Sequence, residues 1–311
     1  MVDGVEKAHV PSSTPMITNI EGLYCCNKFM LKNVYRGIIC ISNDTHIVLI
    51  NPSTRESRNL PFPWYSYPYA NMLDSYVLGV WFDHHQSNSN QPPQGALQHY
   101  KVFRAVISFI GRTYREFQDV NINILFEIYD SREDCWRQGK TLMCKDISTW
   151  SHLLFNGIFH LSVVDGDNSM ITIDAKSEML GRLPLPSEIN DPFKAPSLYI
   201  LRGSLALFVD NYNDKATDIW LMNEYGVKQS WTKQYTIEFD ASSMRSQCMA
   251  AITFWKYMDK EEEEDELFLQ NSDGKLISIN LITKKVTHFE FYGIPCPMTI
   301  VPYIETLLPL K

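Results

Sequence analysis

The sequence has no stretch of 18 uninterrupted apolar residues, and its first 13 residues lack the apolar run of a secretory signal. Nothing in the chain is therefore expected to cross a membrane or to be exported. We expect a cytoplasmic protein, with the nucleus as the alternative location.

The sequence also lacks a cysteine spacing that is typical of disulfide frameworks or zinc sites. The seven cysteines are odd in number and follow no repeating spacing, and no two of them form a Cys-x-x-Cys pair. This argues against a disulfide framework and against a zinc site built from cysteine pairs. We expect reduced, buried thiols, as in most cytosolic proteins.

The chain is short of positive charge and of enzyme signatures. It has 28 Lys and Arg residues against 36 Asp and Glu residues, and its net charge of −8 disfavours nucleic acid and weakly favours a basic protein partner. It contains no phosphate-binding Gly-rich loop, no dinucleotide fingerprint and no Gly-x-Ser-x-Gly elbow. We therefore expect a non-enzymatic protein that needs no metal and no cofactor.

What the chain does contain points to β-structure. Aromatic residues make up 13% of it, and such side chains suit pleated, half-buried surfaces. Residues 1–18 are polar and rich in Pro, Ser and Thr, which predicts a flexible N-terminal tail. Over residues 19–311, short apolar runs alternate with turn residues and long amphipathic helical patterns are hard to find. This region is therefore predicted to be one all-β domain.

The all-β region contains an internal repeat. Units that begin at Gly37, Gly157 and Gly203 share the order strand, turn, strand, turn and short strand, and the last two glycines lie 46 residues apart. The segments 76–138 and 248–290 supply two less regular units. Periods of this length are typical of propeller blades, so we predict a kelch-like β-propeller of five or six blades.

Some residues of these units have an expected structural role. Each leading glycine fits a crowded or positive-φ backbone position just before an innermost strand. Trp136 and Trp231 follow blade turns and are expected to fill the space between blades. The strands led by Gly37, Gly157 and Gly203 carry no Asp or Glu except at their ends, which disfavours a propeller enzyme such as a glycosidase.

Six segments in a fixed order resemble the F-box-associated domain of plant F-box proteins, particularly the S-locus group. Asn51-Pro52-Ser53-Thr54-Arg55 matches one family pattern, and the run from Trp220 to Trp231 matches another. The resemblance covers about residues 20–311, and its carrying segments are 37–61, 100–106, 127–137, 155–186, 218–237 and 301–310.

The resemblance implies a β-propeller that captures a target protein, while an N-terminal F-box binds the Skp1–cullin scaffold of an SCF ubiquitin ligase. S-locus relatives act in self-incompatibility and recognise ribonucleases, so a basic, ribonuclease-like target is implied. Residues 1–18 match no F-box, so we expect no Skp1 contact and an incomplete closing blade around 298–310. The alternative is a truncated, F-box-less paralogue or a non-functional fragment.

An aromatic cluster is the first candidate partner-binding site. Trp64, Tyr65, Tyr67 and Tyr69 follow two prolines in a segment expected to join two blades. Rigid aromatic side chains often supply the hot spots of protein interfaces. The alternative is that they pack between blades.

A long polar loop supplies the second candidate. His84 and His85 follow Asp83, and together with His99 they are expected to lie on an exposed loop over 83–99. Long loops on a rigid scaffold often determine which partner binds. A metal role for this Asp-His-His run would require further acidic motifs.

Acidic residues supply the remaining candidates. Glu262 and Glu263 belong to the acidic run 259–266, which is either a solvated loop or a contact for a basic partner. Asp130, Glu133 and Asp134 lie in a predicted hairpin turn, so we expect solvated side chains rather than a catalytic carboxylate pair.

Overall fold

The computed structural model describes most of the 311-residue chain. The described residues are 29–43, 46–63, 73–83, 99–110, 121–144, 152–165, 168–189, 196–211, 216–238, 250–255, 266–270, 276–283, 285–289 and 303–310. The tail expected over residues 1–18 lies outside them.

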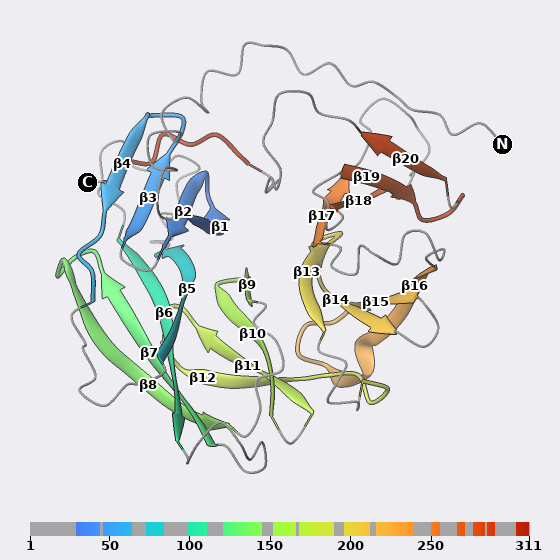
Figure 1. Cartoon of the computed structure of the whole chain (residues 1–311), viewed down its shortest axis with the longest axis horizontal. Coiled ribbons are helices and arrows are strands. Elements are labelled where there is room, and N and C mark those ends of the chain that lie inside the picture. The colour runs from blue at the N-terminus through green and yellow to red at the C-terminus, as the bar shows by residue number, and fades with distance from the viewer. Residues whose placement is uncertain are drawn as a thin grey trace. The chain divides into compact units, whose positions relative to one another are not determined.

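Five four-stranded antiparallel sheets make up the described structure, and each is built from four consecutive strands. The first three sheets are β1 (Met30–Tyr35), β2 (Ile38–Ser42), β3 (Ile47–Asn51) and β4 (Glu56–Asn59); β5 (Leu73–Phe82), β6 (Tyr100–Ile110), β7 (Asn121–Asp130) and β8 (Cys135–Cys144); and β9 (His152–Phe155), β10 (Ile158–Asp165), β11 (Ser169–Asp174) and β12 (Leu180–Pro184). The last two are β13 (Ser197–Leu201), β14 (Ser204–Asn211), β15 (Ala216–Met222) and β16 (Trp231–Glu238); and β17 (Ala250–Trp255), β18 (Glu266–Gln270), β19 (Leu276–Asn280) and β20 (Val286–Phe289). Figure 1 shows them as five separate blades.

The five sheets confirm the predicted all-β propeller architecture with five blades. The only helical element among the described residues is a 3-10 turn at Lys228–Ser230. Consecutive residues are buried along middle strands such as β3, β11 and β14. Because successive side chains point to opposite faces, both faces of a sheet carry buried side chains and need a neighbour to cover them. Stacked blades meet that need.

The leading glycines begin the second strand of a sheet and not the innermost one, which corrects the sequence-based assignment. Gly37 (φ +74°) and Gly157 (φ +77°) each end a two-residue hairpin, behind Arg36 and Asn156, which also have positive φ. Positive φ at both positions is what a tight type I′ hairpin requires. The first strand of each such sheet precedes its glycine, and in the first sheet this strand is β1, which lies before the repeat unit that the sequence analysis begins at Gly37.

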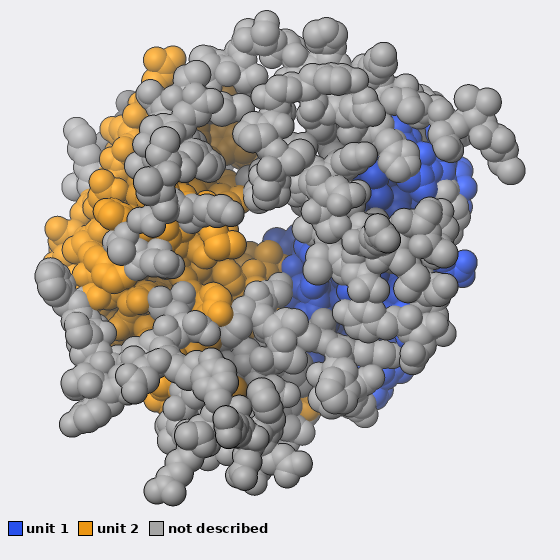
Figure 2. Space-filling view, viewed as in Figure 1, with its two compact units in different colours: residues 1–15, 185–302 blue, residues 16–184, 303–311 orange. Residues whose placement is uncertain are grey.

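The chain divides into two compact units, coloured separately in Figure 2. Unit 1 comprises residues 1–15 and 185–302, and unit 2 comprises residues 16–184 and 303–311. Unit 1 contains two sheets and one apolar core that includes Ala206, Ile219 and Leu267.

Unit 2 contains the first three sheets and two apolar cores. One lies between the first and second sheets and includes Leu49 and Val102, and the other lies between the second and third sheets and includes Phe103 and Phe159. The first strands of these sheets lie beside one another, β1 next to β5 and β5 next to β9.

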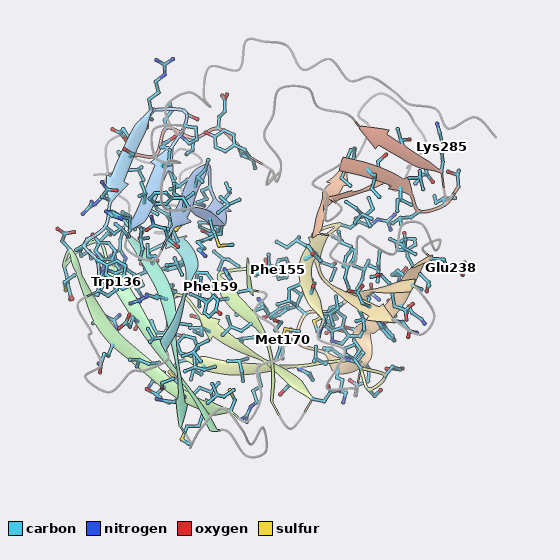
Figure 3. The ribbon with its side chains drawn as sticks, in the orientation of Figure 1. Trp136, Phe155, Phe159, Met170, Glu238 and Lys285 are labelled. Atoms are coloured by element: carbon cyan, nitrogen blue, oxygen red, sulfur yellow. The ribbon has the colours of Figure 1, made fainter. Side chains whose placement is uncertain are left out.

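The structure confirms the prediction that Trp136 lies between two blades. Its indole N–H on β8 donates a hydrogen bond to the carbonyl of Pro61, which follows β4, and its ring packs on Tyr129 (Figure 3). Trp231 is also buried, in unit 1. No helix within the described part of the chain is long and apolar enough to span a bilayer.

The three cysteines within the described residues form no disulfide. Cys40 and Cys144 are buried, as expected, and burial raises the pKa of the Cys40 thiol to about 12. Cys135 is exposed at the start of β8, which corrects the expectation of buried thiols at that position. The other cysteines lie outside the described residues.

Candidate functional site

None of the partner-binding residues proposed from the sequence falls within the described residues. These are Trp64, Tyr65, Tyr67, Tyr69, His84, His85, Glu262 and Glu263. The structure does describe the residues that flank two of these segments, with Pro63 before the aromatic cluster and Asp83 and His99 on either side of the histidine loop.

One end of unit 2 gathers most of its tight connections, and we call it the turn end. It consists of the hairpin tips 36–37 and 156–157, the turns 52–55, 131–134 and 175–178, and the residues Asp83 and His99. Contacts tie these pieces together: the amide of Ala175 donates to the carbonyl of Gly157, and the amide of Ser131 donates to the carbonyl of Tyr100.

Most turns at this end are set by the last residue of the third strand. The Asn51 side-chain oxygen accepts the N–H of Ser53 at 3.0 Å, and Asp174 accepts the N–H of Ser177 at 2.6 Å. Asp130 accepts the N–H of Arg132 at 2.9 Å. Asn and Asp favour such turns because their short side chains reach the backbone two or three residues ahead.

His99 is buried at the base of the long loop, so the expectation that it is exposed was wrong. It is 8% exposed, its Nε2 lies 2.8 Å from Asp130 Oδ1, and its Nδ1 lies 3.7 Å from Asp83 Oδ2. The backbone N–H of Asp83 also donates to the His99 carbonyl at 2.8 Å. The backbone bond therefore joins the two ends of the segment that contains His84 and His85, and Asp130 fixes one of those ends, His99, to the end of β7.

The turn carboxylates differ in exposure. Glu133 and Asp134 are exposed, as expected, but the Asp130 side chain is only 14% exposed. Burial raises the pKa of Asp130, but hydrogen bonds from the Arg132 amide and from His99 outweigh it, so the pKa lies below its ordinary value. Asp130 is therefore an ionised hydrogen-bond acceptor that holds the 131–134 turn and His99 in place.

Arg58 ties the first sheet to the second. Its Nη2 donates to Asp134 Oδ1 at 2.9 Å and to the Tyr129 hydroxyl at 3.0 Å, and the guanidinium also lies over the Tyr100 ring. The Tyr129 hydroxyl donates to the same Asp134 oxygen at 2.5 Å. Both hydrogen bonds hold the pKa of Asp134 below its ordinary value.

Glu178 ties the third sheet to the second. Its Oε1 lies 2.7 Å from Lys101 Nζ and also accepts a hydrogen bond from Arg137. Burial raises the pKa of Glu178, but the bonds from Arg137 and Lys101 outweigh it and hold the pKa below the ordinary range. Because both cations belong to the second sheet, this carboxylate fixes the 175–178 turn against its neighbour.

Replacing Glu178 with glutamine should lower the free energy of unfolding at pH 7 by about 2 kcal/mol, because two partly buried cations lose their carboxylate. The pKa of Glu178 is lower in the folded state than in the unfolded chain. Its stabilisation is therefore complete above the ordinary glutamate pKa and is lost as pH falls through the lowered value. Urea unfolding at several pH values should show the difference from wild type shrinking towards pH 3.

The exposed Glu133 on the neighbouring turn serves as the matched control. Glu133→Gln should change stability by no more than about 0.5 kcal/mol. A deficit of Glu178→Gln that stayed constant as the solution was acidified would contradict the assigned ion pairs.

No group of three or more His, Cys, Asp or Glu side chains that could hold a metal ion occurs among the described residues. The most buried carboxylate, Glu127, is 0% exposed and lies 2.7 Å from Arg104 on the adjacent strand. Burial raises its pKa, against the effect of Arg104.

The turn end can therefore present side chains on a fixed frame. Ion pairs and hydrogen bonds join the three sheets, while other side chains at the same end face solvent. The exposed polar and charged ones are Arg36, Arg55, Arg132, Glu133, Asn156, Lys176 and Ser177. Sequence reasoning missed the contacts that join the sheets because their partners lie between 41 and 77 residues apart. Only the Asn or Asp at each turn gave a local signal.

Comparisons with known proteins complete the description. A family model described as "F-box associated beta propeller domain" matches residues 5–309. F-box protein CPR1 of Arabidopsis thaliana is 21% identical over 88% of this chain and 66% of its own length. F-box protein At3g07870 of the same plant is 24% identical over 87% of this chain and 68% of its own length. The chain thus spans about two thirds of the length of these curated relatives.

Proposed function

Because the chain belongs to the family of F-box associated beta propeller domains, we propose that it recognises a target protein for an SCF-type ubiquitin ligase. The relatives it matches are named as F-box proteins, and they are longer than the match. In this proposal the chain supplies target recognition, and the chemistry of ubiquitin transfer belongs to other subunits.

One structural observation carries the proposal. The turn end of unit 2 combines a frame that is cross-linked between sheets with exposed side chains on tight turns. Binding residues are concentrated on loops that a rigid scaffold positions, because ordering them in advance reduces the entropy lost on binding. The segment 84–98, which includes His84 and His85, begins and ends at this frame.

Two finer points belong to the same proposal. We place the partner among basic proteins, of the ribonuclease-like kind, with the net charge of −8 as support. The turn end itself exposes mostly cations, so its contact in this proposal is with an acidic patch on that partner. We assign no Skp1 contact to the described residues, whose only helical element is the 3-10 turn at Lys228–Ser230. We also assign the protein no catalytic role and place it in the cytoplasm or the nucleus.

The test is a fusion of the full chain to an F-box of established Skp1 binding, expressed in plant cells. A small set of proteins should fall in abundance, and proteasome inhibition should restore them. Reversing charge at the turn end, with Arg36→Glu and Arg132→Glu, should weaken this depletion. The matched control is Lys285→Glu, because Lys285 is exposed and lies in unit 1.

The result that would refute the proposal is also clear. If the fusion binds Skp1 but depletes no protein, the chain is not a target-recognition module. If depletion is unaffected by the turn-end substitutions and abolished by Lys285→Glu, the recognition surface lies in unit 1.

A further inference from the structure

The C-terminal segment 303–310 lies on the first sheet without forming a strand (Figure 1). Side chains of the β3–β4 hairpin hold its backbone. Asn51 Nδ2 donates to the carbonyls of Thr306 at 3.2 Å and of Leu308 at 2.7 Å. Glu56 accepts the Leu310 amide at 3.2 Å, and Arg58 Nη1 donates to the Leu310 carbonyl at 3.4 Å. The segment is therefore bound in the way that a peptide ligand is bound.

The apolar side chains of the segment divide into two sets. Leu310 is 3% exposed, and Leu308 packs against the same core between the first and second sheets. Ile304 and Leu307 are 78% and 84% exposed. Two leucines that are two residues apart thus anchor the segment, while its other face is open to solvent.

The residues that hold this segment are themselves held in place by other bonds. We define the seat as Asn51, Ser53, Glu56 and Arg58. The Asn51 Oδ1 atom accepts the amides of Ser53 and Thr54, and Glu56 accepts the Thr54 hydroxyl at 3.2 Å. Arg58 is fixed by Asp134. Because these bonds do not involve residues 303–310, the donors and the acceptor are already positioned before a peptide arrives.

We propose that this seat is a peptide-binding site, occupied by the chain's own C-terminal segment, which an extended leucine-bearing segment of a partner protein can replace. The contacts define the ligand class. The seat hydrogen-bonds to backbone amides and carbonyls, and the adjoining core receives two leucine side chains that are two residues apart. Such recognition tolerates many sequences. A second copy of the chain is the less favoured source, because two chains of net charge −8 repel each other. This inference does not depend on the proposed function.

The experiment uses the full-length chain with its own segment unseated by Leu308→Asp and Leu310→Asp. The probe is a fluorescein-labelled peptide of residues 303–311, followed by fluorescence anisotropy. The variant should bind the peptide, and the wild-type chain should bind it at least about tenfold more weakly, because a tethered competitor acts at roughly millimolar effective concentration. Leu310→Ala, which removes only one buried side chain, is titrated in parallel, since the double variant can also lose its fold.

Matched substitutions at two similar turns locate the site. Asn51→Asp, added to the unseated chain, keeps the acceptor for the Ser53 and Thr54 amides but removes the Nδ2 donor, so peptide affinity should fall at least about tenfold. Asn280 makes the same turn bonds to Ile282 and Thr283 at 3.0 and 2.7 Å, in unit 1. Asn280→Asp should therefore leave peptide binding unchanged.

Three results would overturn the proposal. The first is a failure of both leucine variants to bind the peptide. The second is an equal loss of affinity from Asn51→Asp and Asn280→Asp. The third is a wild-type dimer, seen by analytical ultracentrifugation, that the leucine substitutions dissociate, because the occupant would then be a second copy of the chain. None of these outcomes bears on protein depletion by the F-box fusion.

Discussion

Replacing Gly79 with alanine should lower the free energy of unfolding by about 3–5 kcal/mol. Gly79 lies at a bulge in β5 and has a φ of +138°, a conformation that residues with a Cβ rarely adopt. An added Cβ would also lie 2.4 Å from the Asn33 side-chain amide carbon. Either the backbone or the amide must move.

The side-chain amide of Asn33 joins the first sheet to the second. Asn33, on β1, donates from Nδ2 to the Val80 carbonyl at 3.0 Å and accepts the Val80 N–H at 3.1 Å. It thus satisfies the edge of β5 as a neighbouring strand would. The expected loss adds backbone strain of about 1–3 kcal/mol to two hydrogen bonds of about 1 kcal/mol each.

Urea unfolding of Gly79→Ala and Gly157→Ala measures this effect against a control. Gly157 is in the same unit and also has positive φ, but an added Cβ would meet its nearest atom at 3.5 Å, an ordinary contact. Its substitution should cost only about 1–2 kcal/mol. Equal losses for the two variants would mean that the Asn33 contact contributes nothing.

The second large effect is expected from Phe159→Ala, which should cost about 3–5 kcal/mol. Phe159 is 0% exposed on β10, and its ring centre lies 4.9 Å from that of Phe103 on β6, so the pair joins the third sheet to the second. Removing the ring leaves a cavity that the two sheets cannot easily close.

Phe155 provides the comparison for this variant (Figure 3). It lies on the adjacent strand β9 and is only partly buried. Phe155→Ala should cost about 1–2 kcal/mol. Calorimetry should therefore give a clearly lower midpoint for Phe159→Ala than for Phe155→Ala, and a midpoint equal to wild type would exclude the assigned packing between sheets.

Local patterns in the sequence were sufficient to predict the blades. Apolar runs separated by Asn, Asp, Pro and Gly gave the five repeats, and the turns after Asn51, Asp130 and Asp174 lie where the sequence predicts them. The strand β1, Met-Leu-Lys-Asn-Val-Tyr, was missed because it mixes polar with apolar residues and is only partly buried. Its position is set by pairing with β2 and by the contact with β5.

Apart from the place of Trp136, the contacts between blades could not be predicted from the sequence. Asn33 and Val80 are 47 residues apart, and nothing in either segment indicates that they meet. His99 was expected to be exposed because the preceding loop is polar, yet it is buried beside Asp83, which follows β5, and Asp130, which ends β7. The proposed partner-binding aromatics and histidines lie outside the described residues, so they stay predictions.

The return of the chain at Tyr303 has a consequence for how the two units are connected. Residues 185–302 leave unit 2 after Pro184, and the chain rejoins unit 2 in the segment 303–310. The segment 185–302 is thus joined to unit 2 covalently at Pro184, and at its other end the chain is held by the noncovalent contacts of residues 303–310. The entropy cost of closing a long loop rises only with the logarithm of its length, so a few hydrogen bonds and two leucines can hold it closed. A peptide that took the seat would release the C-terminal end of this long loop from the first sheet.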